Sequence, residues 1–319
     1  MFKYLRPSRS IRNMLKSTLV RVNSVLERAS IRLQPTHYYS ETPSRIELAS
    51  DLTIWANPLP MFGIDWDLDD QLKWTRSMAE PFIAEVRGLQ AFKTLASEGA
   101  GPGYGPIESQ LLHCVIRSIK PNAILEIGSG VSTMVIKRAC ELNVQDSDRK
   151  SSLTCVEPFP RDILINDPDI VLQRERAQSV PRHTFSSLAS GDVLFIDSTH
   201  AVRTGSELPL LYLDVIPSLP PGVLIHIHDI FLPYYYSPDI LWNLFDSQES
   251  TLLAALLTNN RQLRVLTCMS ALHFDRESEL RAIFPDYRPE QFSHGLRARG
   301  VEGHFPSSLW LVTQDVSTS

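Results

Sequence analysis

The sequence lacks several features that would place it in a specialised class of protein. Its 319 residues contain no uninterrupted apolar run close to the roughly 18–20 residues that a membrane-spanning helix needs. It has only four cysteines, without the paired spacing of a metal-binding motif. Most of these cysteines lie inside apolar segments, which favours buried, reduced thiols and a cytoplasmic location. The composition, 43% hydrophobic and 21% charged, is that of an ordinary globular protein.

Negative charge is nearly absent from residues 1–36, which carry eight Lys or Arg and one acid, a net charge of +7. The rest of the chain has 23 basic and 35 acidic residues, a net charge of −12, which does not indicate a nucleic-acid partner. Apolar residues of the basic segment recur at helical spacing, among them Met14, Leu15, Val22 and Val25. Three interpretations compete: a loosely held helical tail, which we slightly favour, an amphipathic helix on an anionic membrane, and a targeting presequence.

Proline and glycine divide the chain into segments. Residues 34–63 are rich in proline and turn formers, which indicates a linker or an extended stretch. Residues 67–96 then show helical apolar periodicity, as expected of a helical cap. The run GAGPGYG at residues 99–105 breaks the chain before a regular α/β alternation. We therefore predict three parts: a basic N-terminal extension over residues 1–45, a helical cap and linker over 46–100, and a catalytic domain over 101–319.

The third part alternates short apolar strands with helices. Continuous apolar strands separated by helices indicate a mostly parallel sheet that is covered on both faces. We predict an α/β fold with a doubly wound, mostly parallel seven-stranded sheet and an N-terminal helical extension. The predicted strands span residues 123–127, 153–156, 170–173, 192–196, 223–228, 264–269 and 308–313, and the predicted helices span 107–119, 131–142, 204–216 and 240–257.

Chemistry is expected at the carboxyl ends of the strands, where doubly wound folds bind their ligands. The first strand runs into the segment Glu126-Ile-Gly128-Ser129-Gly130. The two glycines permit a tight turn and a close approach of the backbone to a ligand, and Ser132 or Thr133 can cap the next helix. A dinucleotide-binding loop needs a third glycine where this chain has Thr133, which disfavours NAD and FAD.

The second strand also ends in an acid, Glu157. A carboxylate at such a position can accept hydrogen bonds from both hydroxyls of a ribose. The alternative is a solvated carboxylate at a strand end. The position of Glu157, one strand–helix unit after the glycine loop, favours ribose binding.

These segments resemble the Rossmann-like (class I) S-adenosylmethionine-dependent methyltransferases, in particular a bacterial branch of small-molecule and sugar O-methyltransferases. The resemblance rests on EIGSG-ST, FIDSTH and HIHDIFLP, and it spans about residues 101–313. It implies that Glu157 binds the ribose of S-adenosylmethionine and that Gln178 lies near the adenine. It also implies that Tyr104 and Glu108 lie over the methionine end, and that the cofactor loop consists of Glu126, Gly128, Ser129, Gly130 and Ser132.

The acceptor side centres on Asp197, which ends the fourth strand beside the expected sulfonium of the cofactor, and on His200 in the following turn. His228 and Asp229 end the fifth strand, whereas His226 on the same strand is expected to be structural. One use of these residues is proton removal from the acceptor, with His228 as the base and Asp197 and His200 beside it. The other is a divalent metal such as Mg²⁺, bound by Asp197, His228 and Asp229. Because His228 stands where related metal-dependent enzymes have a carboxylate or amide, we favour the metal-free base.

Two flanking segments are expected to shape the pocket. Residues 231–236, with Trp242, are rich in aromatic side chains, which fit a lid over a sugar or aromatic acceptor and a packed hinge equally well. The second segment, residues 294–304, is either a mobile loop over the acceptor or a solvated loop. It is rich in glycine, arginine and histidine, and it carries His294, Arg297, Arg299 and His304.

The predicted function is S-adenosylmethionine-dependent methylation of an oxygen atom on a small molecule or sugar. Alignment does most of the work in methyl transfer from a sulfonium, so the cofactor half of a sequence is more informative than the acceptor half. Two alternatives stay open: a cofactor-binding but inactive relative, and a less favoured NAD-dependent oxidoreductase. The expected partner is a small-molecule acceptor, with no nucleic acid, and a homodimer is compatible with the sequence. The expected location is cytoplasmic, with residues 1–36 as a peripheral membrane contact under the amphipathic interpretation.

Overall fold

The computed structural model describes residues 9–35, 40, 42–89, 92–93, 103–243 and 246–315. Most of the predicted break at residues 99–105, and the last part of the predicted cap helix, lie outside these residues. The chain forms two compact units, residues 1–52 and 53–319, and each is described by itself. The three-part division predicted from the sequence stays a prediction.

The first unit contains the basic segment. Its longest element is the helix α1 (Arg9–Leu26), which is followed by the short helix η1 (Glu27–Ala29) and by α2 (Arg45–Ser50). Asn23 ties the end of α1 to the following chain, because its side-chain amide donates to the carbonyl oxygen of Leu33 and its oxygen accepts from the Leu33 amide, each at 2.8 Å. Within the described chain, no helix combines the length and the apolar character needed to cross a membrane.

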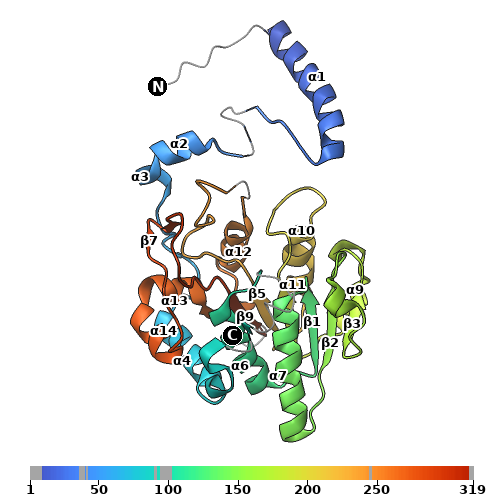
Figure 1. Ribbon diagram of the computed structural model, residues 1–319, viewed down its shortest axis with the longest axis vertical. Helices are drawn as coiled ribbons and strands as arrows, with labels where there is room; N and C mark the ends of the chain where they lie inside the picture. Colours follow the sequence, from blue (N-terminus) through green and yellow to red (C-terminus); the bar gives the residue numbers. More distant parts are fainter. Residues whose placement is uncertain are drawn as a thin grey trace. The chain divides into compact units, whose positions relative to one another are not determined.

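The second unit is built on a seven-stranded sheet with the strand order β3-β2-β1-β4-β5-β9-β6 (Figure 1). All neighbouring strands are parallel except β9, which runs antiparallel to both β5 and β6. This confirms the predicted doubly wound, mostly parallel sheet, and the predicted strand limits agree to within about one residue. The strands are β1 (Ala123–Ile127), β2 (Ser152–Val156), β3 (Ile170–Gln173), β4 (Val193–Ile196), β5 (Leu224–Ile227), β6 (Leu263–Cys268) and β9 (Leu309–Thr313).

Each face of the sheet has its own hydrophobic core, because successive strand residues point to opposite faces. Ile124 and Phe195 face one core, and Leu125 and Ile196 face the other. The first core is covered by α4 (Leu68–Ala79), η2 (Ile83–Leu89), α6 (Pro106–Ile119), α7 (Val131–Ser147), α13 (Met269–Asp275) and α14 (Glu277–Ile283). The second is covered by η4 (Ala177–Ser179), α9 (Arg182–Ser186), α10 (Leu208–Leu210), η5 (Leu211–Val215), α11 (Ile216–Ser218) and α12 (Glu249–Leu257).

The remaining short elements are α3 (Leu52–Trp55), α8 (Asp162–Ile165) and the hairpin β7 (Phe292–Ser293) with β8 (Leu296–Arg297). The predicted helix over residues 240–257 begins only at Glu249. Asp239 explains the difference, because its carboxylate accepts hydrogen bonds from Ser237 and Asn243. These bonds hold residues 238–242, which precede α12, in turns. The four cysteines are free, and three of them are buried, as their apolar surroundings predicted.

Candidate active site

The glycine loop joins the ends of three strands. Gly128 has φ +102°, and a Cβ atom on it would lie 2.1 Å from the carbonyl oxygen of Asp197 at the end of β4. Its amide donates to the carbonyl of Val156 at the end of β2. Only glycine fits this position, because any side chain would force β1 and β4 apart. At the start of α7 the amide of Gly130 donates to the hydroxyl of Thr133 at 2.9 Å, so Thr133 caps the helix.

Glu126 is completely buried beneath this loop. One carboxylate oxygen accepts from the Ser132 hydroxyl at 2.6 Å, and the other accepts from the Cys155 thiol at 3.2 Å. Burial raises the pKa of Glu126 to about 7, although these hydrogen bonds act in the opposite direction. Glu126 and Ser132 therefore hold the shape of the loop, and Cys155 is a partner that sequence reasoning missed.

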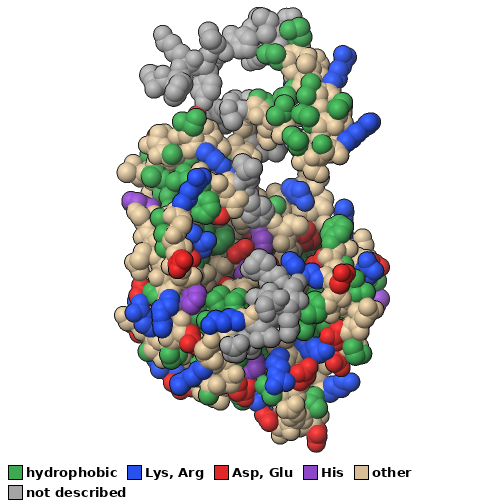
Figure 2. All heavy atoms as spheres, in the orientation of Figure 1, with side chains coloured by type: hydrophobic (Ala, Val, Ile, Leu, Met, Phe, Trp, Pro, Cys, Tyr) green, Lys and Arg blue, Asp and Glu red, His purple; other side chains and the backbone are tan. Residues whose placement is uncertain are grey.

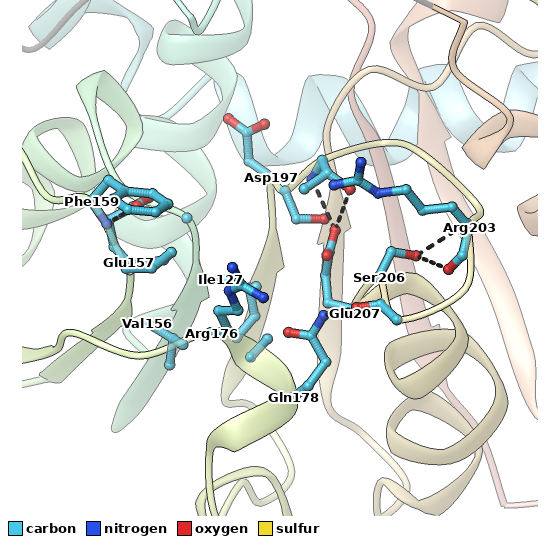
Figure 3. Close-up of a pocket in the computed structure, with 16 residues that line it drawn as sticks. Ile127, Val156, Glu157, Phe159, Arg176, Gln178, Asp197, Arg203, Ser206 and Glu207 are labelled. Atoms are coloured by element: carbon cyan, nitrogen blue, oxygen red, sulfur yellow. Dashed lines mark hydrogen bonds between the residues drawn. The ribbon is translucent and has the colours of Figure 1, made fainter. Parts of the chain in front are cut away.

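A cavity of about 340 Å³ lies at the carboxyl ends of β1, β2 and β4 (Figure 3). Four of the predicted cofactor residues line it: Gly128, Glu157, Gln178 and Asp197. The other five, Tyr104, Glu126, Ser129, Gly130 and Ser132, are not among the lining residues, and their roles as cofactor contacts stay predictions.

The polar residues of the cavity are held in place by the backbone. One oxygen of Glu157 accepts from the Phe159 amide at 2.7 Å, and the Gln178 amide donates to the carbonyl of Gly205 at 2.8 Å. On the opposite wall, Glu207 accepts from the amide and hydroxyl of Thr199. Figure 3 shows Glu157 and Phe159 on one side of the cavity and Arg203, Ser206 and Glu207 on the other.

Phe159 is a candidate site residue that sequence reasoning missed. Its side chain is 82% exposed, although it lies on the cavity wall two residues after Glu157. An exposed aromatic ring beside a ribose-type acid is suited to stacking on a purine base. The segment Glu-Pro-Phe could have suggested this role, because the chain turns over the cavity directly after the strand-end acid. The cavity thus combines a volume in the range of small-molecule sites with a strand-end acid and an exposed aromatic ring, the features expected of an adenosine site.

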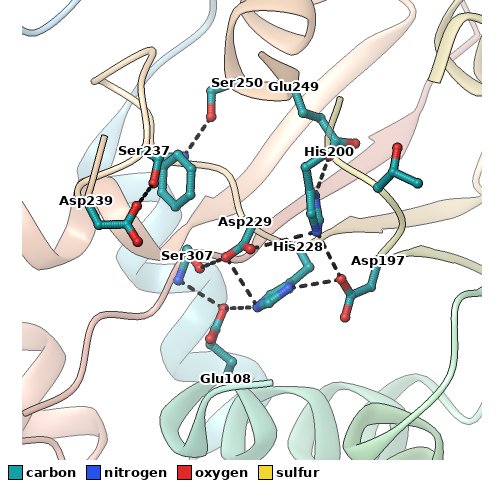
Figure 4. A network of polar contacts seen from close by, with 12 residues as sticks. Glu108, Asp197, His200, His228, Asp229, Ser237, Asp239, Glu249, Ser250 and Ser307 are labelled. Carbon is teal, nitrogen blue, oxygen red and sulfur yellow. Dashed lines mark hydrogen bonds and ion pairs between the residues drawn. The ribbon is translucent and has the colours of Figure 1, made fainter. Parts of the chain in front are cut away.

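Next to the cavity, four strand-end side chains form the network of Figure 4. Oδ1 of Asp197 lies 3.2 Å from Nδ1 of His228 and 3.3 Å from Nε2 of His200. The Asp229 carboxylate lies 3.7 Å from Nε2 of His200 and 3.8 Å from Nε2 of His228. The structure thus brings together all four residues predicted for the acceptor side, and Asp197 joins them to the cofactor cavity. His200 and Asp229 both have positive φ values, +54° and +52°, a strained conformation that often occurs at functional sites.

Two buried glutamates lie behind the histidines. Nδ1 of His200 is 2.7 Å from Oε2 of Glu249, whose other oxygen accepts from Tyr212 at 2.7 Å. Nε2 of His228 is 3.6 Å from Oε1 of Glu108, which also accepts from the Ser307 amide. The resemblance placed Glu108 over the methionine end of the cofactor, which stays a prediction. In the structure its carboxylate lies beside Nε2 of His228. Glu249 was missed, because only the fold brings it close to His200.

Tyr104 lies beneath this network and is buried. Its hydroxyl is 3.1 Å from Nε2 of His226, and its ring is 4.9 Å from that of His228. Burial lowers the pKa of His226 well below its ordinary value, so this ring is neutral. These contacts agree with a structural role for His226.

The charges of the network oppose the effect of burial. Burial alone would raise the pKa of Asp197, but the neighbouring histidines hold it far below its ordinary value. Burial alone would lower the pKa of His200, but its hydrogen bonds to Asp197 and Glu249 raise it to about 10. The pKa of His228 is raised well above its ordinary value, because the charge of Asp197 and two further carboxylates outweighs burial. Without a metal, both imidazoles therefore favour the positively charged form, with a proton on each ring nitrogen. A charged imidazole has no lone pair to accept a proton, which weighs against His228 as a free base.

The donor set of this network does not fit Mg²⁺, which prefers oxygen ligands. Within the described residues, the group of side chains able to share one ion is Asp197, His200 and His228, whose ligand atoms all lie within 4.8 Å of one another. Two of these three ligands are imidazole nitrogens. The group also differs from the predicted one, since His200 takes the place that the sequence assigned to Asp229.

The aromatic stretch after Asp229 is packed rather than open. Phe231 and Tyr236 are buried, and Tyr236 donates to the carbonyl of His294 at 2.9 Å. The ring of Tyr234 lies 4.9 Å from that of Phe274, and Trp242 donates to the carbonyl of Arg297 at 3.4 Å. These contacts favour the packed hinge over the lid. In the adjoining segment Arg297 pairs with Glu290, Arg299 lies over the Trp242 ring, and His304 accepts from the Arg288 amide.

Comparison with known proteins agrees with this site. Residues 125–230, which run from within β1 to just after β5, match a family described as a methyltransferase domain. A search among curated proteins found no match. Among solved structures, the chain is similar to the O-methyltransferase TomG from Streptomyces achromogenes, involved in tomaymycin synthesis and solved in complex with SAM. The identity is 14% and the TM-score 0.43, over 71% of this chain and 90% of TomG.

A candidate methyltransferase from Thermobifida fusca YX is also similar, with 11% identity and a TM-score of 0.31, over 83% of this chain and 97% of that chain. Because both TM-scores are below 0.5, the functional assignment rests on the matched domain and on the site described above. That domain contains Gly128, Glu157, Gln178 and Asp197, the predicted residues that line the cavity.

Proposed function

Since the chain is a Rossmann-like methyltransferase that uses S-adenosylmethionine, we propose that it methylates an oxygen atom of a small molecule whose hydroxyl binds at the network around Asp197. The observation that carries this proposal is the double role of Asp197. It lines the cofactor cavity, and its Oδ1 also lies 3.2 and 3.3 Å from the two histidines. A hydroxyl bound there would be next to the reactive end of the cofactor, as in-line transfer requires.

Asp197, His200 and His228 are the proposed catalytic residues. The low pKa of Asp197 keeps its carboxylate ionised, so it can accept a hydrogen bond from the acceptor hydroxyl. The two histidines would orient the acceptor oxygen and stabilise the charge that develops on it as its proton passes to water. A sugar acceptor and a homodimer stay predictions, as does the alternative of a cofactor-binding but inactive relative. The matched methyltransferase domain disfavours an oxidoreductase.

Transfer of a labelled methyl group from S-adenosylmethionine to a panel of sugars, phenols and other hydroxyl compounds tests the proposal. Labelled product that survives mild base treatment is expected, because an ether is stable and a carboxyl ester is not. Label found on nitrogen would contradict the proposed acceptor atom. Absence of transfer to every compound, with the cofactor bound, would favour the inactive relative.

Cofactor binding is expected to depend on Glu157. The substitution Glu157→Ala should weaken S-adenosylhomocysteine binding about 10- to 100-fold, because each ribose hydroxyl would lose a hydrogen bond to a charged partner. Titration calorimetry measures the change. Glu175→Ala is the matched control, since this exposed acid follows the carboxyl end of β3 but is not among the residues that line the cavity. Equal affinity of the Glu157 variant and the control would remove Glu157 from the ribose site.

The predicted membrane contact is a separate proposal about the first unit. Apolar side chains gather along α1 with basic ones beside them (Figure 2), and Met14, Leu15 and Val25 are exposed. An amphipathic helix with this positive charge would bind anionic membranes and would not bind neutral ones. Deletion of residues 1–36 should therefore abolish cosedimentation with phosphatidylserine vesicles, whereas phosphatidylcholine vesicles should bind neither form. Equal cosedimentation of both forms would leave the segment as a helical tail, and the cytoplasmic location stays a prediction.

A further inference from the structure

The two histidines of the network converge on a single carboxylate oxygen. Each ring has one nitrogen directed at Oδ1 of Asp197, at 3.3 Å for Nε2 of His200 and 3.2 Å for Nδ1 of His228. The opposite nitrogen of each ring faces a different buried glutamate. Figure 4 shows the two rings between these carboxylates, with Asp197 on one side and Glu108 and Glu249 on the other sides.

Glu249 determines which nitrogen of His200 carries the proton. A carboxylate only accepts hydrogen bonds, so Glu249 places a proton on Nδ1 of His200 and leaves the lone pair of Nε2 directed at Asp197 when the ring is neutral. Glu108 places a second carboxylate 3.6 Å from Nε2 of His228, beyond hydrogen-bond distance, while Nδ1 of this ring faces Asp197 at 3.2 Å. Metal-binding histidines commonly donate their second nitrogen to a carboxylate in this way.

The spacing of the three inward-facing atoms also fits an ion. Ligands about 2.1 Å from a metal lie roughly 2.9–3.4 Å apart in octahedral or tetrahedral geometry. Both measured separations from Asp197 fall in this range, and the third separation is within 4.8 Å. The supporting glutamates are held in turn, Glu249 by Tyr212 and Glu108 by the Ser307 amide.

We infer that Asp197, His200 and His228 form a binding site for a divalent first-row transition ion, such as Mn²⁺, Fe²⁺, Co²⁺ or Zn²⁺, rather than for Mg²⁺. Two imidazoles and one carboxylate are a donor set typical of such ions and leave coordination positions open. The open side faces the more accessible carboxylates, since the side chains of Asp197 and Asp229 are 25% and 37% exposed, whereas Glu249 is fully buried. An acceptor hydroxyl could reach the ion from that side; this use of the ion rests on the proposed function, but the binding of the ion does not.

The site would supply chemistry to an acceptor hydroxyl bound on its open side. An ion bound at these three side chains would lower the pKa of a hydroxyl that coordinates to it, so that the proton could pass to water before the oxygen takes the methyl group. Asp197 would hold the ion at the edge of the cofactor cavity, beside the methyl group. Glu108 and Glu249 are positioning residues, since they act through the histidines.

Cobalt(II) is a suitable probe, because its visible absorption reports the ligand set independently of catalysis. Titration of the full chain, freed of metal by a chelator, is expected to saturate at one Co²⁺ per chain. Mg²⁺ should bind at least about 100-fold more weakly. His200→Ala and His228→Ala should each weaken Co²⁺ binding by at least about 100-fold, and Glu249→Gln by about 10- to 100-fold with an altered spectrum. His183→Ala is the matched control, since this exposed histidine of α9 lies outside the network.

S-adenosylhomocysteine binding is measured on the same samples, as evidence that each variant is folded. Binding of S-adenosylhomocysteine without any cobalt spectrum would overturn the metal site and leave the proposed function intact. A cobalt spectrum unchanged in the two histidine variants would place the ion elsewhere and also overturn the inference. A normal cobalt spectrum without methyl transfer to any hydroxyl would contradict the proposed function but not the metal site.

Discussion

Replacing Asp197 by alanine is expected to lower methyl transfer by about a thousandfold while the chain stays folded. Loss of a group that positions or deprotonates the nucleophile typically costs 10²- to 10⁴-fold. Asp197 combines several tasks, because both histidines converge on its Oδ1 and its carboxylate also borders the cofactor cavity. Single-turnover transfer of a labelled methyl group, on the acceptor found in the screen, measures the loss.

Binding and chemistry can be separated in this variant. Since the cavity lining also includes Glu157, Phe159 and Gln178, which this variant keeps, S-adenosylhomocysteine affinity should change far less than turnover. Asp162→Ala, which removes an exposed acid on α8, should retain full activity. More than a tenth of the original turnover in the Asp197 variant would show that the acceptor oxygen binds elsewhere.

Metal removal gives a second route to the same conclusion. If Asp197 acts by holding an ion, a chelator should reduce turnover of the original chain but leave the residual turnover of the Asp197 variant unchanged. If Asp197 acts only through hydrogen bonds, the chelator should affect neither. The comparison therefore connects the loss of activity to one of the two uses of the network that the sequence left open.

The residues that the sequence predicted best are those that end a buried strand. Each parallel strand is a short apolar run, and the first polar residue after it is easily located. Asp197, His228, Asp229 and Glu157 were found in this way, and their convergence follows from the rule that parallel strands end at the same edge of a sheet. The residues that support them could not be found, because their proximity depends on helix packing.

Glu249 and Tyr104 illustrate this limit. Glu249 begins α12, which the sequence placed inside a longer helix, and only the packing of that helix brings it to His200. The family resemblance places Tyr104 over the methionine end of the cofactor, which stays a prediction, and nothing in the sequence indicated that its hydroxyl would lie 3.1 Å from Nε2 of His226. Position along the chain does not determine the side to which a side chain turns, and the hydrogen bond available in the core decides it.

The same limit applies to the largest expected effect on stability, which no sequence motif indicated. Arg117 is almost fully buried on α6. Its Nε and Nη2 atoms each donate to Glu85 at 2.9 Å, and Nη1 donates to Asn143 at 2.6 Å. Asp146 on α7 is a further partner, and the guanidinium lies 4.7 Å from the centre of the Phe82 ring. One side chain thus ties η2 and α7 to α6.

Arg117→Met is expected to lower the free energy of unfolding by about 1.5–3 kcal/mol, because Glu85 and the buried Asn143 lose a charged hydrogen-bond partner, whereas the carboxylates of Glu85 and Asp146, 31% and 54% exposed, keep contact with water. Urea unfolding measures the change. Arg138→Met is the matched control on α7: its ion pair with Glu141 is exposed on both sides, so a change below about 1 kcal/mol is expected. Similar losses in both variants would show that the Arg117 network adds nothing beyond an ordinary surface pair.

The effect of Arg117→Met should also depend on pH. Burial alone would raise the pKa of Glu85, but its hydrogen bonds to Arg117 and His113 lower it below the ordinary value of 4.5. A carboxyl group with a lowered folded-state pKa contributes stability above its ordinary pKa and loses that contribution as the pH falls through the lowered one. The difference between Arg117→Met and the original chain should therefore be full at pH 7 and shrink as the pH falls below 4.5. Because α6 carries Glu108 and α7 follows the glycine loop, the variant should also weaken cofactor binding near its unfolding midpoint.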